Sequence, residues 1–132
     1  MSQDAGVALI ADDTPINQEL FGAILKSLGL EVLSAKHGGE AIEIVTQRLR
    51  DKQRLDVIFM DMMMPVVSGI EATEKIRDLG FVGPILVFSA DVSRKTANRA
   101  LEAGANHYFL KSTISLDLAR ALIDKFCFVK LK

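Results

Sequence analysis

Polar side chains that could bind a cation or a phosphoryl group follow four apolar runs of the sequence. They are the pair Asp12-Asp13, then Asp61, Ser89 and Lys111. The apolar runs lack polar alternation, which is typical of strands covered on both faces in a parallel sheet. Parallel strands end at one common edge, where ligands bind in open α/β sheets. We therefore expect these distant positions to meet in one pocket.

The chemistry of such a pocket follows from its charges. Three carboxylates held together repel one another by roughly several kcal/mol, so they need a cation. Hard oxygen ligands with spare water positions favour Mg²⁺, with Mn²⁺ as the near substitute. Lys111 adds a mobile positive charge and Ser89 a hydroxyl donor. Together these groups suit an incoming phosphoryl group, with one carboxylate as the attacking nucleophile.

The elements that position these residues alternate between strand and helix. Strands are predicted over five short ranges, 6–11, 31–35, 55–60, 84–88 and 106–110. Helices are predicted to begin at Thr14-Pro15, at Gly38, at the capping box from Ser68 to Glu71, near Ser93 and near Ser115. Fivefold alternation with short connections predicts an α/β fold, a doubly wound five-stranded parallel sheet with helices on both faces.

The first helix carries an apolar stripe that should face the core, consisting of Leu20, Phe21, Ile24, Leu25 and Leu28. Ile16 lies outside this stripe, beside Pro15 and the acidic pair. We expect Ile16 to be exposed and to contact a partner protein.

Length and composition narrow the class of protein. The 132 residues predict a single domain over 1–132, with a core from about 6 to 129 and frayed ends. A net charge of −1 gives no electrostatic footprint for nucleic acid or a membrane surface. The sequence shows neither a signal peptide nor an apolar stretch long enough to span a membrane. The single Cys127, expected to pack in the core, fits a cytoplasmic protein.

These motifs resemble a receiver domain of two-component signalling, also called a response regulator domain. The resemblance covers the chain from about Val7 to the last helix, and it rests on the acidic pair, the segment MDMMMPVVSG around Asp61, Ser89-Ala90 and Lys111. The segments DDTPINQEL and MDMMMPVVSGIEATEKIR most resemble receivers of hybrid histidine kinases. The resemblance implies a flavodoxin-like sheet with strand order 2-1-3-4-5.

The resemblance also implies how the acidic residues act. Asp61 would be the phosphoacceptor, taking a phosphoryl group from a phosphohistidine on a histidine kinase or a histidine phosphotransfer protein. Asp13 and Asp61 would bind Mg²⁺ directly, together with the backbone carbonyl of Met63. Asp12 would act through a metal-bound water. The domain would be a signalling module that catalyses only its own phosphorylation and dephosphorylation.

Three further roles are implied by the same resemblance. Lys111 would pair with the phosphoryl group, and Ser89 would donate a hydrogen bond to it. Tyr108 would be the aromatic switch residue whose position reports phosphorylation.

The sequence departs from the family pattern at Ser112, where a proline with a cis bond is common. A cis bond without proline costs about 2.5–4 kcal/mol, so the sequence leaves open whether the Lys111-Ser112 bond is cis and how the loop to the last helix is shaped.

Other functions fit the sequence less well. The charged loop from Asp12 to Pro15 would repel the phosphate of a flavin, and the glycine motif of dinucleotide enzymes is absent. A phosphatase-like hydrolase with an aspartyl nucleophile would need a carboxylate two residues after Asp61, where Met63 stands. A degenerate receiver that binds partners constitutively is a further alternative. With no effector domain in the sequence, we expect either a stand-alone receiver or a receiver from a larger kinase.

Overall fold

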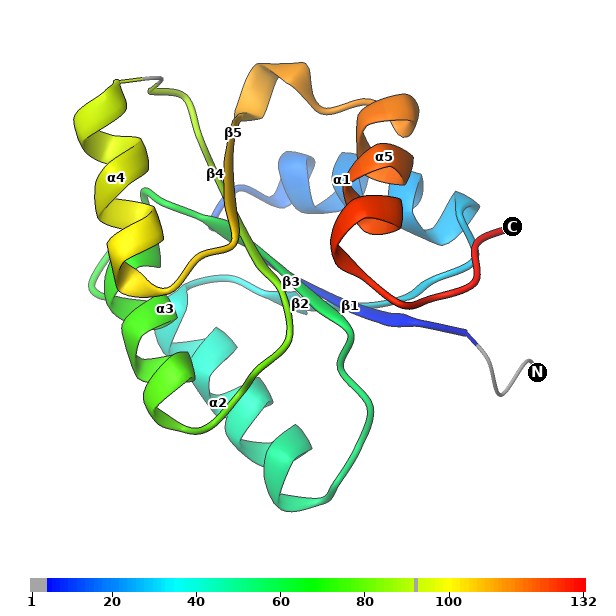
Figure 1. The fold of residues 1–132 in the computed structure, drawn as a ribbon, viewed down its shortest axis with the longest axis horizontal. Coiled ribbons are helices and arrows are strands. Elements are labelled where there is room, and N and C mark those ends of the chain that lie inside the picture. The colour runs from blue at the N-terminus through cyan, green and yellow to red at the C-terminus, as the bar shows by residue number, and fades with distance from the viewer. Residues whose placement is uncertain (1–4, 92) are drawn as a thin grey trace.

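One parallel sheet of five strands organises the chain. The computed structural model describes residues 5–91 and 93–132. The strands are β1 (Val7–Ala11), β2 (Glu31–Ala35), β3 (Val57–Asp61), β4 (Ile85–Ser89) and β5 (His107–Leu110) (Figure 1). They pair in parallel in the order β2-β1-β3-β4-β5. This topology confirms the predicted doubly wound, flavodoxin-like fold.

Five α-helices cover the two faces of the sheet (Figure 1). One layer holds α1 (Pro15–Ser27) and α5 (Leu116–Phe126), and the other holds α2 (Gly38–Arg50), α3 (Gly69–Asp78) and α4 (Arg94–Ala103). A short 3₁₀ turn, η1 (Lys111–Thr113), leads from β5 towards α5. Helices on both faces bury the central strands β1, β3 and β4 along their length, so polar groups of these strands gather at their ends, where ligands bind in open α/β sheets.

The strands are apolar because both of their faces are buried. Every residue of β1, β3 and β4 is buried. Alternate residues belong to separate cores, so that Leu9 and Ile58 pack towards α2 and α3, whereas Ile10 and Phe59 pack towards α1 and α5. Edge-on contacts between Phe21 and Phe59, with ring centroids 4.7 Å apart, join α1 to the sheet.

The predicted helix ends are largely confirmed. The side chains of Ser68, Ser93 and Ser115 each accept a hydrogen bond from a backbone N–H in the first turn of their helix. Gly104 ends α4 in the left-handed conformation, with φ of 117°. His37 caps α2 by accepting a hydrogen bond from the Glu40 N–H.

Three expectations need correction. Leu20 is 58% exposed and does not join the buried stripe of α1. β3 and β4 each extend one residue beyond the predicted ends, so Asp61 and Ser89 are the last strand residues. The C-terminal residues are not frayed, because the Lys132 N–H donates to the Leu28 carbonyl at 2.9 Å. The fraying expected at the N-terminus concerns residues 1–4, which lie outside the described residues.

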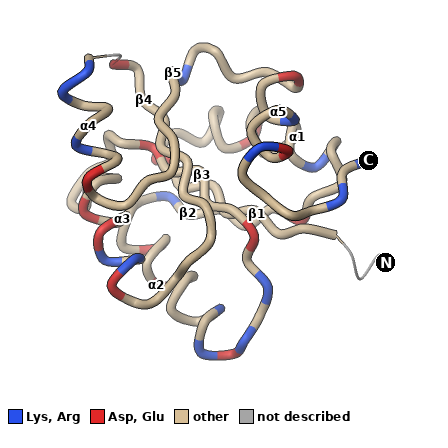
Figure 2. The backbone as a smooth tube through the Cα atoms, viewed as in Figure 1, with Lys and Arg blue, Asp and Glu red and all other residues tan. Residues whose placement is uncertain are grey.

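The surface shows charges of both signs. Acidic and basic residues occur side by side along the helices (Figure 2). Within the described residues, no helix is both long and apolar enough to cross a membrane.

The end of the sheet opposite the acidic pair is held by one arginine of α3. Arg77 donates to the carbonyls of Phe81, Gly83 and Gly104 at 2.7–2.9 Å, and to the side-chain oxygen of Asn106 at 2.8 Å. Asn106 also accepts a hydrogen bond from the Ile85 N–H, at the start of β4. The guanidinium thus joins α3, the loop before β4 and the loop before β5. Only a planar group with several donors can serve all of these acceptors.

We therefore predict that Arg77→Lys destabilises the protein by about 2–3 kcal/mol, because one ammonium cannot replace the fork of hydrogen bonds. The melting temperature should fall by roughly 6–10 °C for a chain of this size. Arg99→Lys is the matched control, since Arg99 is exposed on α4. Equal melting temperatures for the two variants in thermal unfolding followed by circular dichroism would contradict the role of Arg77.

Candidate functional site

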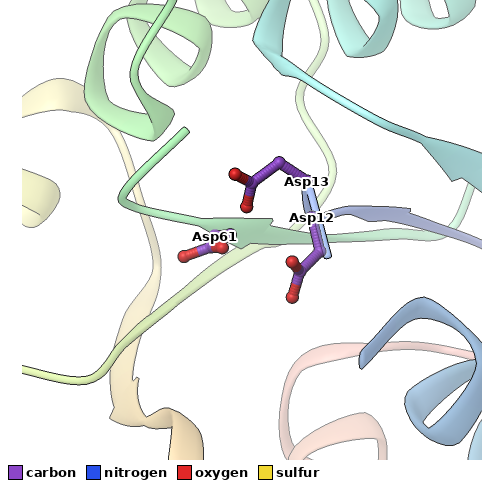
Figure 3. Close-up of side chains that lie close together, drawn as sticks. All are labelled: Asp12, Asp13 and Asp61. Atoms are coloured by element: carbon purple, nitrogen blue, oxygen red, sulfur yellow. The ribbon is translucent and has the colours of Figure 1, made fainter. Parts of the chain in front are cut away.

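Three carboxylates meet at the carboxyl end of the sheet. Asp61 ends β3, and Asp12 and Asp13 directly follow β1, the neighbouring strand. One carboxylate oxygen from each lies within 4.8 Å of the others (Figure 3). Asp12 and Asp61 are buried, whereas Asp13 is exposed at the mouth of the pocket. The convergence predicted from the strand ends is therefore present.

The carboxylate cluster has the composition of a magnesium site. Oxygen atoms at this spacing can face one small cation, and an exposed Asp13 leaves the site open to water and to a substrate. Buried like charges without a cation are unfavourable, which is a reason for this cluster to bind one. Asp12, Asp13 and Asp61 thus fit a divalent cation with hard-ligand preference.

Lys111 partly neutralises the cluster. Its Nζ lies 3.2 Å from a carboxylate oxygen of Asp12 and 3.2 Å from one of Asp61. Burial lowers the pKa of Lys111, but the two neighbouring carboxylates outweigh burial and the net pKa is raised. The lysine is therefore charged at neutral pH. It reaches the site from the first residue of the turn that follows β5.

The surroundings of Asp61 disfavour the ionised form of its carboxylate. Burial, followed by the charge of Asp12, raises its pKa to about 6, although Lys111 and the Met63 N–H act in the opposite direction. The Met63 N–H donates to the Asp61 carboxylate at 3.2 Å. A cation bound beside this carboxylate would favour its ionised form.

Ser89 and Tyr108 are linked through one residue of the loop after β4. The Ser89 hydroxyl is buried and accepts a hydrogen bond from the Asp91 N–H at 3.1 Å. The Tyr108 hydroxyl donates to the Asp91 carbonyl. The Asp91 carboxylate itself accepts from the N–H of Ser93 and from the hydroxyl of Thr96 at the start of α4. Asp91 thus links Ser89 to Tyr108 and to the start of α4.

The methionines that follow Asp61 differ in their exposure to solvent. Met62 and Met64 are buried and pack in the core, whereas the Met63 side chain is 72% exposed. A metal contact from the Met63 carbonyl stays a prediction.

Ser112, at the position where the resemblance leads one to expect proline, lies within the 3₁₀ turn. No peptide bond within residues 5–91 and 93–132 is cis.

Sequence reasoning missed one residue beside the acidic pair. Gln18, on the second turn of α1, donates its side-chain amide to the Ile10, Asp12 and Ala35 carbonyls. A glutamine in a helix carries no pattern that predicts such contacts, because the acceptors come from β1, β2 and the loop between β1 and α1.

Comparison with known proteins agrees with this geometry. The profile of a family described as the response regulator receiver domain matches residues 8–123. The chain is 32% identical over 121 residues to the osmosensing histidine protein kinase SLN1 of Saccharomyces cerevisiae. That match covers 90% of this chain and 10% of SLN1, so the chain spans about a tenth of the length of this relative.

Two solved structures are similar over almost the whole chain. The receiver domain of the histidine kinase CKI1 from Arabidopsis thaliana, complexed with Mg²⁺ and BeF₃⁻, is 31% identical with a TM-score of 0.78, covering 91% of this chain and 90% of that one. A second match comes from the co-crystal structure of the Saccharomyces cerevisiae histidine phosphotransfer signalling protein Ypd1 with the receiver domain of Ssk1. It is 29% identical with a TM-score of 0.80 and covers 96% of this chain and 92% of that one.

The raised pKa of Asp61 predicts a stability cost in the absence of a divalent cation. The folded protein holds this proton up to about pH 6, whereas a carboxyl with the ordinary pKa of 3.8 loses it earlier, so folding stability falls as pH rises between these values. The difference corresponds to on the order of 3 kcal/mol above pH 6. Asp61→Asn should therefore raise the melting temperature at pH 7.5 in EDTA by about 3–6 °C, allowing for the lost contact with Lys111.

The gain from Asp61→Asn should shrink towards pH 4, where the wild-type carboxyl is protonated. Asp124→Asn, at an exposed position of α5, is the matched control and should change the melting temperature little at either pH. A wild-type protein more stable than Asp61→Asn at pH 7.5 in EDTA would contradict this interpretation.

Proposed function

The chain belongs to the response regulator receiver domain family, and we propose that Asp61 is the residue at which it accepts a phosphoryl group. A receiver domain is a signalling domain of a two-component phosphorelay and not an enzyme in the usual sense. The observation that supports Asp61 is its position: it is a buried carboxylate at the end of the central strand β3, in contact with Lys111 and beside Asp12 and Asp13.

In the proposed reaction an oxygen of the Asp61 carboxylate attacks the phosphorus of a phosphohistidine. The new O–P bond forms as the N–P bond of the donor breaks, and the electron pair of that bond stays on the imidazole nitrogen. Lys111, held 3.2 Å from Asp61, places a positive charge where the phosphoryl oxygens gather negative charge. The Ser89 hydroxyl accepts from Asp91 in this structure, so its own proton can be donated to a phosphoryl oxygen.

We propose that Asp12, Asp13 and Asp61 hold Mg²⁺, or Mn²⁺ in its place. The cation would neutralise the carboxylates and the phosphoryl oxygens, as bound cations do in phosphoryl transfer. The CKI1 receiver complexed with Mg²⁺ supports this assignment by similarity.

We propose that phosphorylation acts on the rest of the molecule through Ser89, Asp91 and Tyr108. The phosphoryl group on Asp61 would carry about 1.5–2 negative charges, which attract the Ser89 hydroxyl. Because Asp91 bonds to both Ser89 and Tyr108, movement of the serine changes the loop on which the tyrosine hydroxyl rests. The result is a shift in population between two arrangements of α4 and β5.

The partner that delivers the phosphoryl group is proposed to be a histidine kinase or a histidine phosphotransfer protein. The co-crystal structure of Ypd1 with the Ssk1 receiver supports the second by similarity. On this chain, Ile16 and Leu20 lie one turn apart on α1 and are 71% and 58% exposed. Leu20 also lines a hollow of about 420 Å³ that reaches Asp12 and Lys111. An apolar pair beside the acidic pocket suits a helical partner that presents a phosphohistidine.

Phosphorylation by a small donor tests the assignment of Asp61. Incubation with acetyl phosphate and Mg²⁺ should add one phosphate to the wild-type protein, and the product should be absent for Asp61→Asn and in EDTA. Asp124→Asn should be phosphorylated as the wild type is. Intact-protein mass spectrometry measures all four, and labelling of Asp61→Asn at the wild-type level would refute the assignment.

A second experiment tests the docking surface. Ile16→Asp should slow transfer from a phosphorylated histidine phosphotransfer protein by about tenfold, because it places a charge in an apolar contact. Labelling by acetyl phosphate should be unchanged. Val82→Asp is the matched control, since Val82 is 94% exposed beside the opposite end of the sheet and should affect neither reaction. Equal slowing with both donors would show damage to the site and not to docking.

A further inference from the structure

The carboxyl end of the β1–β2 pair has more acceptors than backbone donors. The Asp12 N–H donates to the Ala35 carbonyl at 3.0 Å, which closes the last rung between the two strands. Beyond this rung the chain turns into α1, so no neighbouring strand donates a hydrogen bond to the Asp12 carbonyl. Parallel strands that stop at a site leave such carbonyls for other groups to satisfy. Here the unsatisfied end adjoins the acidic pair.

The side-chain amide of Gln18 donates hydrogen bonds to the carbonyls at this end of the two strands. Nε2 of Gln18 lies 2.6 Å from the Ala35 carbonyl oxygen, 3.0 Å from that of Asp12 and 3.1 Å from that of Ile10. Three carbonyls from two strands and the loop after β1 thus converge on one amide nitrogen. An N–H₂ group has two hydrogens, so at least one of them is shared between two acceptors.

The orientation of this amide is fixed by its surroundings. Oε1 of Gln18 is buried and has no hydrogen-bond partner among the described residues, whereas the donor end of the side chain makes hydrogen bonds to three carbonyls. Exchange of the oxygen and the nitrogen would point an acceptor at three carbonyl oxygens. The position therefore requires a donor, and one long enough to reach from α1 across the end of both strands.

The contact with the Asp12 carbonyl places this donor within the backbone of the metal site. Asp12 and Asp13 are the only parts of the carboxylate cluster that stand on a loop, because Asp61 belongs to a strand. The Thr14 N–H holds the Asp12 carboxylate at 2.9 Å, and Gln18 holds the peptide group between Asp12 and Asp13 through its carbonyl. Without the hydrogen bond from Gln18, fewer contacts would hold this loop against the repulsion among the three carboxylates.

We infer that Gln18 is a positioning residue of the cation site: its amide fixes the peptide that carries Asp12 and Asp13, and so sets the affinity for Mg²⁺. The inference rests on the proposed function, in which these carboxylates bind the cation. Gln18 does not contact Asp61, Lys111 or Ser89 in any of its hydrogen bonds. Its removal should therefore weaken cation binding more than it slows phosphoryl transfer once the site is filled.

The test compares Gln18→Met and Gln18→Ala with the wild type. Methionine keeps the length of the side chain without its donors, and alanine favours the helix in case methionine packs poorly. Titration with Mg²⁺, followed by the NMR signals of the Asp13 and Met63 amides, gives the dissociation constant. Both variants should bind Mg²⁺ about tenfold more weakly, the size of effect usual for residues that orient metal ligands. Labelling by acetyl phosphate at saturating Mg²⁺ should stay within about twofold of the wild type.

Gln47→Met on α2 is the matched control, because Gln47 is exposed, and its Mg²⁺ affinity should equal that of the wild type. A lower melting temperature with an unchanged dissociation constant for both Gln18 variants would show a purely structural role and overturn the inference. A wild-type protein that fails to bind Mg²⁺ would instead refute the proposed cation site, which separates the two failures.

Discussion

Crowding of negative charge at one edge of the sheet is the constraint on which the site depends. The fold brings Asp12, Asp13 and Asp61 within 4.8 Å because β1 and β3 are neighbours that end at the same level. Two of these carboxylates are buried, where water cannot screen their repulsion. Lys111 offsets part of this repulsion, but burial, followed by the charge of Asp12, still raises the pKa of Asp61. A bound cation would stabilise the ionised carboxylates.

At each end of the sheet, one helix side chain donates hydrogen bonds to several backbone carbonyls. At the acidic end, the amide of Gln18 gathers three carbonyls of the β1–β2 edge. At the other end, the guanidinium of Arg77 gathers three carbonyls around the starts of β4 and β5. In each case a side chain from a helix donates hydrogen bonds to backbone carbonyls at one end of the sheet. The covering helices are thus fixed to the sheet by polar contacts as well as by the apolar core.

The proposed switch joins buried strand ends to a polar loop. Asp61 and Ser89 end buried strands, whose backbone is held by the core. Asp91, by contrast, lies in the loop between β4 and α4, where its backbone contacts Ser89 and Tyr108 and its carboxylate caps α4. Hydrogen bonds through Asp91 thus connect Ser89 with α4 and β5, and this is the route that we propose for the switch.

The sequence by itself determined the fold and the positions of the acidic site. Unbroken apolar runs such as Val57–Met60 predict buried parallel strands, and polar residues at their ends predict one edge, because parallel topology gives strand ends a common location. The tertiary structure decided what depends on distance. It placed Leu20 outside the core, because helical spacing alone does not show how far the buried face of a helix extends. It also assigned Gln18 and Arg77 their acceptors, which come from other elements of the chain. Periodicity reports which face of an element is apolar, whereas hydrogen bonds between elements exist only once packing has brought donor and acceptor together.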